Sequence, residues 1–154
     1  MTGSRGLTLA VLQARCSSTR LPGKVLKPLA GEPMILRQLE RIARAKNVDS
    51  IVMATSTDPS DDELTSIVES AGYRVVRGPL DDVLARFVTV IEHVDPEVVV
   101  RLTGDCPLIS PQIIDQVIES FHRSSADYVS NTLVPTFPDG LDVEVVTARA
   151  LCAV

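Results

Sequence analysis

Apolar runs alternate with amphipathic segments along nearly the whole chain. The first four runs, rich in Val, Ile, Leu and Ala, are each followed by a segment whose apolar residues recur every three or four positions. Runs of this kind predict strands, the amphipathic segments predict helices, and their alternation indicates right-handed βαβ units. The predicted strands cover residues 8–14, 50–55, 73–76, 97–102, 126–130 and 140–146, and the predicted helices cover residues 33–45, 61–71, 81–93 and 110–123.

The predicted fold is α/β, with three α/β/α layers around a mostly parallel sheet. Hydrophobic residues make up 45% of the 154, but aromatic residues only 3%, so the core must be aliphatic. An aliphatic core suits parallel strands that are buried on both faces. We expect a single domain over residues 1–154. Residues 147–154 read as the first turns of a helix without a C-cap, so we expect a domain that is shortened at its C-terminus relative to longer relatives.

Charge is distributed unevenly along the chain. The first 31 residues contain no acid, and the net charge of the whole chain is −5, so the remainder must hold −10. A cationic loop after the first predicted strand is suited to a compact polyanion, whereas an acidic remainder argues against nucleic acid and anionic membrane. A nucleoside triphosphate fits best, and no apolar stretch predicts a membrane span. The cations of the acid-free stretch are Arg5, Arg15, Arg20, Lys24 and Lys27.

Cysteine usage points to a reducing compartment. Cys16, Cys106 and Cys152 are odd in number and far apart, which matches neither a disulfide framework nor zinc-ligand spacing. We predict three reduced thiols in a cytoplasmic protein.

The fourth predicted strand ends close to an acid. Ligands of open α/β sheets bind beyond the carboxyl ends of the strands, so the cations of the first loop and Asp105 are predicted to share one edge. Cations facing a carboxylate are suited to a metal–triphosphate complex, with Asp105 holding Mg²⁺. Two glycine-rich phosphate-binding motifs do not fit the spacing. A P-loop needs Ser or Thr after its Lys and a Gly six residues before it, but Lys24 is followed by Val25 and has no such Gly. A dinucleotide-binding fingerprint needs three glycines, but the first loop has only Gly23.

Several collinear motifs carry a family resemblance. The chain resembles sugar-activating cytidylyltransferases, most closely the spore coat polysaccharide biosynthesis protein F group and more distantly the synthetases of CMP-linked octulosonate and sialic acid. The motifs are Ala14-Arg15-x-x-Ser18-Thr19-Arg20-Leu21-Pro22-Gly23-Lys24, Arg77-Gly78 with Asp81-Asp82-Val83-Leu84, Val100-Arg101-Leu102-Thr103-Gly104-Asp105-Cys106-Pro107, Asp127-Tyr128-Val129-Ser130-Asn131-Thr132, and Gly140-Leu141-Asp142-Val143-Glu144.

The resemblance implies a nucleotide-diphospho-sugar transferase (Rossmann-like) fold and transfer of CMP from CTP to a sugar. It implies that Asp105 binds the metal, and that Lys24, Arg15 and Asp105 form the catalytic set. Thr103 stands where the octulosonate relatives usually carry Gln. The nucleotide-binding positions that the resemblance implies are Ala14, Arg15, Ser18, Arg20, Lys24, Arg77, Gly78 and Thr103.

Two further acids lie in the last predicted strand. The two-residue period of a strand puts Asp142 and Glu144 on one face, opposite three apolar residues. Such a pair is suited to sugar hydroxyls or to a second metal, and we predict contact with the acceptor.

Other polar residues have simpler interpretations. Asp81 and Asp82 suit the start of a helix, Arg86 suits either a phosphate contact or a salt bridge, and Arg101 should meet an acidic partner. Cys106 is predicted to be a packed thiol. The two histidines, His93 and His122, are predicted to be surface residues.

The sequence therefore predicts a cytidylyltransferase that binds CTP, Mg²⁺ and a small sugar acceptor, with no nucleic acid or membrane partner. A homodimer is compatible with the resemblance. Two alternatives stay open: a nucleotidyltransferase of the same fold that uses another nucleotide, and a shortened, inactive nucleotide-binding module.

Overall fold

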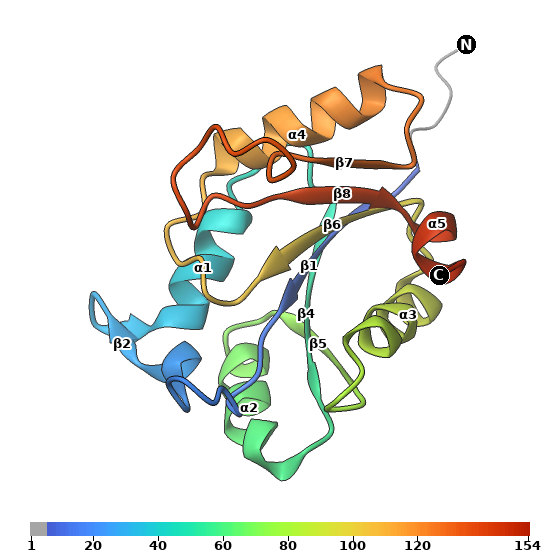
Figure 1. Cartoon of the computed structure of the whole chain (residues 1–154). Helices are drawn as coiled ribbons and strands as arrows, with labels where there is room; N and C mark the ends of the chain where they lie inside the picture. The colour runs from blue at the N-terminus through green and yellow to red at the C-terminus, as the bar shows by residue number, and fades with distance from the viewer. Residues whose placement is uncertain (1–5) are drawn as a thin grey trace.

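Six strands form the central sheet of the structure (Figure 1), a computed structural model that describes residues 6–154. Their spatial order is β5-β4-β1-β6-β8-β7, and the four strands from β5 to β6 run parallel. β8 is antiparallel to both of its neighbours. The strands are β1 (Thr8–Gln13), β4 (Ser50–Ser56), β5 (Arg74–Gly78), β6 (Val98–Thr103), β7 (Tyr128–Ser130) and β8 (Glu144–Thr147).

Helices cover both faces of the sheet. One buried cluster joins the sheet to α1, α2 and α4, and a second joins the other face to α3 and α5. The predicted three-layer α/β/α arrangement with a mostly parallel sheet is confirmed. The helices are α1 (Met34–Ile42), α2 (Asp62–Ser70), α3 (Val83–Val94), α4 (Pro111–Arg123) and α5 (Ala148–Cys152), with short 3₁₀ helices η1 (Lys24–Leu26) and η2 (Pro59–Asp61).

The central strand β1 shows why an aliphatic sequence forms this sheet. Leu9 and Val11 pack into one cluster and Ala10 and Leu12 into the other, and all four side chains are fully buried. A strand with helices on both faces has no solvent side, so it needs a continuous apolar run rather than an alternating one.

Helix starts follow from their capping residues. The Ser110 side chain accepts a hydrogen bond from the Ile113 amide at the start of α4, within the predicted helix range 110–123. The start predicted for α3 at Asp81 is wrong by two residues, because Asp82 is the N-cap and accepts from the Ala85 amide at 2.9 Å.

The last strand begins four residues later than predicted. The side-chain amide of Asn131 bonds to the segment that precedes β8. Its Nδ2 donates to the Leu141 carbonyl at 2.8 Å, and its Oδ1 accepts from the Val143 amide at 2.9 Å. Apart from one long backbone bond from the Asn131 amide to the Val143 carbonyl at 3.3 Å, these side-chain bonds take the place of strand pairing, and β8 starts at Glu144. The predicted face shared by Asp142 and Glu144 is therefore wrong, because Asp142 lies outside the strand.

The sequence patterns also missed a small hairpin. β2 (Pro28–Leu29) and β3 (Glu32–Pro33) pair antiparallel between η1 and α1. These strands are too short to show a two-residue period. Within residues 6–154, no helix has the length and apolar character needed to cross a membrane. Arg5, one of the predicted cations, lies outside the described residues.

Candidate active site

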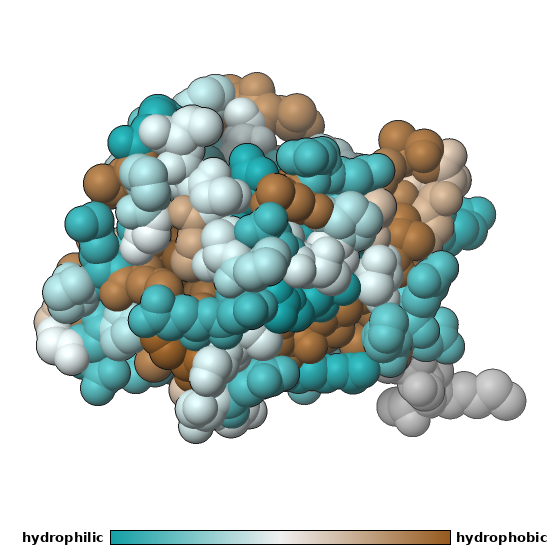
Figure 2. Space-filling view, turned by 90° about the horizontal axis from the view of Figure 1, so that it is seen from below, coloured by the Kyte–Doolittle hydropathy of each residue, from teal (hydrophilic) through white to brown (hydrophobic). Residues whose placement is uncertain are grey.

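A cavity of about 250 Å³ opens at the carboxyl ends of β1 and β6. The face seen in Figure 2 carries hydrophilic side chains across its middle, with hydrophobic atoms visible between and beneath them. The predicted first loop and the predicted acid do share one edge of the sheet. The cavity is lined by Gln13, Ala14, Arg15, Ser18, Thr19, Arg20, Lys24 and Val25 from the first loop, and by Thr103, Gly104 and Asp105 from the end of β6.

The two strand ends approach closely at a glycine. The Gly104 amide donates to the Gln13 carbonyl at 2.8 Å, which extends the pairing of β1 and β6 past their last residues. A Cβ on Gly104 would stand 2.7 Å from the Ala14 Cβ and 3.0 Å from the Gln13 carbonyl oxygen. Only a glycine beside a small residue allows this approach, and it sets Asp105 directly across from the first loop.

The first loop folds back on the backbone of one residue. The Cys16 carbonyl accepts from the amides of both Ser18 and Gly23, each at 2.9 Å. Gly23 has a φ of 67°, in the left-handed region that favours glycine, and it is the N-cap of η1. The next residue is Lys24, and the side chain of Val25 is buried in the core. The loop therefore closes between Cys16 and Gly23 and is anchored in the core at Val25.

Lys24 and Asp105 meet across the cavity. The Lys24 Nζ lies 3.7 Å from the Asp105 Oδ2, and 49% of the Asp105 side chain is exposed. Partial burial opposes ionisation of Asp105, but a hydrogen bond from the Thr103 hydroxyl and the charge of Lys24 outweigh it and hold the pKa of this carboxyl below its usual value. Asp105 is thus an ionised carboxylate in a largely cationic site.

Two further cations border the cavity. Arg15 and Arg20 are both exposed. The Arg15 Nη1 donates a long bond of 3.5 Å to the Leu80 carbonyl. A bond of this length costs little to exchange for a phosphate oxygen, so both guanidinium groups are available to an anion.

The donor set fits Mg²⁺ that is shared with a phosphate ligand. Residues 6–154 contain no group of three or more His, Cys, Asp or Glu side chains placed to hold a metal on their own. Mg²⁺ is commonly bound through one or two carboxylates together with substrate phosphates. The ionised, half-exposed Asp105 supplies such a carboxylate, and the cations opposite it suit the phosphates.

Arg77 and Gly78 lie outside the cavity lining. The Arg77 Nε donates to the Ser56 carbonyl at 2.7 Å, its Nη2 donates to the Asp58 carbonyl at 2.9 Å, and the same Nη2 pairs with Asp62 at 2.7 Å. Gly78 is buried against α3, where an added Cβ would stand 3.0 Å from the Arg86 Cγ. The structure therefore gives both residues structural contacts at the end of β5.

Asp142 and Glu144 also lie outside this cavity. Glu144 accepts from the Arg101 Nη1 at 2.6 Å, in register across β6 and β8. The guanidinium of Arg101 lies 5.7 Å from the centre of the Phe87 ring. This ion pair lines a second hollow of about 410 Å³ beside α3. The prediction that Arg101 meets an acidic partner is confirmed, whereas Asp142 is exposed before β8 begins.

The simpler interpretations of Cys106, His93 and His122 agree with the structure, whereas the salt bridge offered for Arg86 is not formed among the described residues. Cys106 is a buried thiol, and burial raises its pKa. His93 and His122 are exposed. Arg86 is 1% exposed and donates to the carbonyls of Pro79 and Leu80, so it orders the segment that precedes α3.

Sequence reasoning missed two buried polar residues that support the site. Gln38 of α1 is fully buried, and its Nε2 donates to the Thr103 carbonyl at 2.7 Å, which fixes the end of β6. Asp61 is also fully buried and accepts from the Cys16 amide at 2.7 Å. Gln38 was detectable as a polar residue on the apolar face of a predicted helix, between Ile35 and Leu39. Asp61 gave no such signal, because an acid at a helix start is ordinary.

The fold is that of solved cytidylyltransferases. The chain belongs to the cytidylyltransferase family, whose model matches residues 9–153. It is 41% identical to the spore coat polysaccharide biosynthesis protein SpsF of Bacillus subtilis (strain 168), over 93% of this chain and 60% of that protein. It is 39% identical to a 3-deoxy-manno-octulosonate cytidylyltransferase of Geobacter sulfurreducens, over 76% of this chain and 46% of that enzyme. The chain thus spans about half to three fifths of the length of these relatives.

Solved structures support the same assignment. A cytidylyltransferase from Leptospira borgpetersenii superposes with a TM-score of 0.90 at 32% identity, over 95% of this chain and 62% of that chain. A CMP:2-keto-3-deoxy-manno-octonic acid synthetase in complex with CTP superposes with a TM-score of 0.75, over 95% of this chain and 76% of that chain. Its 19% identity shows a shared fold alone. The resemblance seen in the sequence motifs is confirmed.

Proposed function

We propose that the protein is a cytidylyltransferase that transfers CMP from CTP to a sugar and releases pyrophosphate. The observation that carries the proposal is the cavity in which Lys24 and Asp105 face each other, 3.7 Å apart, beyond the carboxyl ends of β1 and β6. Cations and one ionised acid in a single cavity suit a metal-bound triphosphate better than a neutral ligand.

The reaction needs little covalent chemistry from the protein. A sugar hydroxyl oxygen attacks the α-phosphorus of CTP in line and loses its proton to solvent. The bond from that phosphorus to the bridging oxygen breaks, and pyrophosphate leaves with the bridging oxygen. Negative charge spreads over the phosphate oxygens as the bond breaks. Lys24 and Arg15 stabilise this charge, while Arg20 and the Ser18 hydroxyl hold phosphate oxygens and Ala14 borders them.

Asp105 would hold Mg²⁺ together with oxygens of the triphosphate. When bound, Mg²⁺ supplies positive charge that offsets the charge of the phosphates. The low pKa of Asp105 supports this role, because the carboxylate stays ionised without the metal.

The nucleoside and acceptor sides of the site follow from the remaining residues. We assign Thr103 to the nucleotide, since it lines the cavity, and we assign Arg77 and Gly78 to shaping the nucleoside side through the backbone that they contact. Asp142 and Glu144 are assigned to the acceptor, with Glu144 acting beside the hollow that it shares with Arg101. The names of the relatives support an acceptor used in polysaccharide or glycan biosynthesis.

The test is pyrophosphate release by the purified protein with CTP, Mg²⁺ and a panel of sugar acids and sugar phosphates. We expect release with at least one acceptor, and its loss in Asp105→Ala. Absence of both Mg²⁺-dependent CTP binding and pyrophosphate release would reject the proposal. Competition among CTP, UTP, GTP and ATP separates it from a nucleotidyltransferase that uses another base. An inactive nucleotide-binding module would behave alike with and without the Asp105→Ala change.

The cellular setting is part of the same proposal. Because the proposed reaction consumes CTP, we also propose a cytoplasmic location with reduced cysteines. Homodimer formation stays a prediction that light scattering would test.

A further inference from the structure

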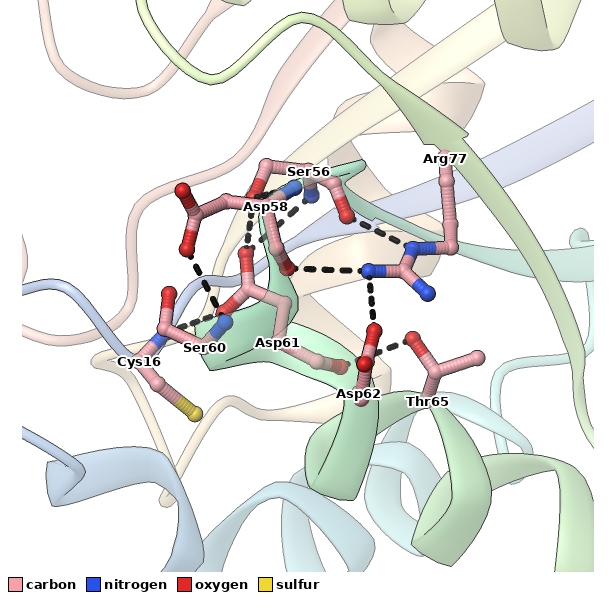
Figure 3. A network of polar contacts seen from close by, with 8 residues as sticks. All are labelled: Cys16, Ser56, Asp58, Ser60, Asp61, Asp62, Thr65 and Arg77. Carbon is pink, nitrogen blue, oxygen red and sulfur yellow. Dashed lines mark hydrogen bonds and ion pairs between the residues drawn. The ribbon is translucent and has the colours of Figure 1, made fainter.

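Asp61 is a fully buried carboxylate at the junction of η2 and α2. It accepts hydrogen bonds from the Cys16 amide at 2.7 Å, from the Ser56 amide at 3.2 Å and from the Ser56 hydroxyl (Figure 3). A buried carboxylate is costly unless donors surround it. These three donors come from the first loop and from the end of β4, so the acid joins two segments that are distant in sequence.

The Asp61 side chain does not cap the helix that it precedes. It occupies the N-cap position of α2, yet its side chain makes no capping hydrogen bond to that helix. The turn before it is capped by a different acid, because Asp58 accepts from the Ser60 amide at 2.9 Å. Helix stabilisation therefore leaves the bond from Asp61 to Cys16 unexplained.

The bond to Cys16 reaches the residues that border the cavity. Arg15 precedes Cys16, and the Cys16 carbonyl accepts from the amides of Ser18 and Gly23. Gly23 in turn precedes Lys24, whose Nζ faces Asp105. One residue, Cys16, thus holds the cationic loop through its carbonyl, and its amide is in turn held by Asp61.

We propose that Asp61 is a positioning residue for the triphosphate of CTP, acting through the backbone of Cys16. The inference rests on the proposed function, since it names what the loop holds in place. Asp61 contacts no ligand itself. It places the loop cations before the anion arrives, so that little of the binding free energy is spent on ordering the loop.

The first test compares Asp61→Asn with Asp62→Asn. Asparagine keeps the size of the side chain but offers one acceptor oxygen, so the amide of either Cys16 or Ser56 loses its partner. Asp62→Asn removes the same charge from the next residue. It breaks the ion pair with Arg77 but leaves the bonds of Arg77 to the Ser56 and Asp58 carbonyls in place. We expect Asp61→Asn to bind CTP with Mg²⁺ about tenfold more weakly and Asp62→Asn to bind like the wild type, both measured by calorimetry.

Two further measurements separate positioning from a general loss of stability. CMP lacks the β- and γ-phosphates, so Asp61→Asn should lower the ratio of CTP to CMP affinity, whereas mere destabilisation would leave that ratio unchanged. Ser56→Ala removes the hydroxyl bond but keeps the bond to Cys16, and it should destabilise the junction while leaving CTP affinity within about twofold of wild type.

Amide hydrogen exchange of the wild-type protein keeps the test informative if Asp61→Asn fails to fold. The Cys16 amide should be strongly protected before CTP is added, and rapid exchange there would overturn the proposal. Equal CTP affinity in Asp61→Asn and wild type, or an equal loss in Ser56→Ala, would also overturn it. A wild-type protein that binds no CTP would instead reject the proposed function, with the exchange result still deciding the role of Asp61.

Discussion

The carboxyl ends of the parallel strands and the antiparallel edge of the sheet are organised differently. At the parallel ends, short-range hydrogen bonds through Cys16 and the close approach at Gly104 hold charged side chains toward a cavity. At the antiparallel edge, Asn131 holds the chain before β8, and the charges of Arg101 and Glu144 neutralise each other at 2.6 Å.

The two regions differ in whether neighbouring side chains neutralise their charges. Lys24, Arg15 and Arg20 outnumber the one acid that lines their cavity, so an anion gains from entering it. The Arg101–Glu144 pair leaves no excess charge, so it suits the hydroxyl groups of a sugar acceptor rather than a charged group. Substitutions in the two regions should therefore affect different substrates.

The largest effect is expected for Lys24→Met. Losing the cation that faces Asp105 removes charge stabilisation during bond breaking, and we expect kcat/KM for CTP to fall about a hundredfold or more. Steady-state pyrophosphate release measures the loss. Lys27→Met is the matched control, because Lys27 belongs to the same acid-free stretch but is exposed outside the cavity lining. Equal losses in both variants would mean that net charge, rather than the position of Lys24, attracts the nucleotide.

Two glycine substitutions test whether CTP binding depends on the close approach of β1 and β6 at Gly104. Gly104→Ala sets a Cβ 2.7 Å from the Ala14 Cβ, so the ends of β1 and β6 must separate, at a cost of about 1–3 kcal/mol in the free energy of unfolding together with weaker CTP binding. Gly140→Ala meets nothing within 4 Å but strains a residue with φ of 94°. It should cost about 1 kcal/mol and leave CTP binding unchanged.

Urea unfolding measures the free energy of unfolding of both glycine variants, and CTP titration measures their affinity for CTP. The comparison between the two regions breaks down if Gly140→Ala weakens CTP binding as much as Gly104→Ala does.

The same two regions show how far the sequence predicts the structure. Residues near the parallel strand ends were predictable, because apolar runs locate the strands and parallel strands deliver their loops to one edge. The start of β8 was not, since the Asn131 side chain replaces strand pairing ten or more residues away, which no local period reveals. The role of Asp61 was not predictable for a related reason. Its partner Cys16 lies 45 positions away, and burial decides its role.

A smaller effect, confined to the acceptor, is expected for Glu144→Gln. This change removes the charge that pairs with Arg101 while keeping the shape of the side chain, so it should raise KM for the sugar about tenfold and leave KM for CTP unchanged. Asp142→Asn serves as the comparison within the same predicted pair. A rise in KM for CTP alone would move Glu144 to the nucleotide side and remove the distinction between the two regions.

The smallest predicted effect concerns the thiol reactivity of Cys16, whose backbone carbonyl holds the first loop. Burial, followed by the negative charge of Asp61, raises the pKa of the Cys16 thiol from 9.0 to about 11. Near pH 8 its thiolate fraction should be about a hundredfold below that of an ordinary thiol, so iodoacetamide should label the exposed Cys152 first, as peptide mass spectrometry would show. Because the pKa of Cys16 is raised in the folded state, the contribution of its protonated thiol to the free energy of unfolding is complete below pH 9 and is lost as the pH rises toward about 11. Labelling of Cys16 ahead of Cys152 at pH 8 would show that the first loop opens around Cys16 in solution. The contrast between a fixed cationic loop and a neutralised edge would then no longer hold.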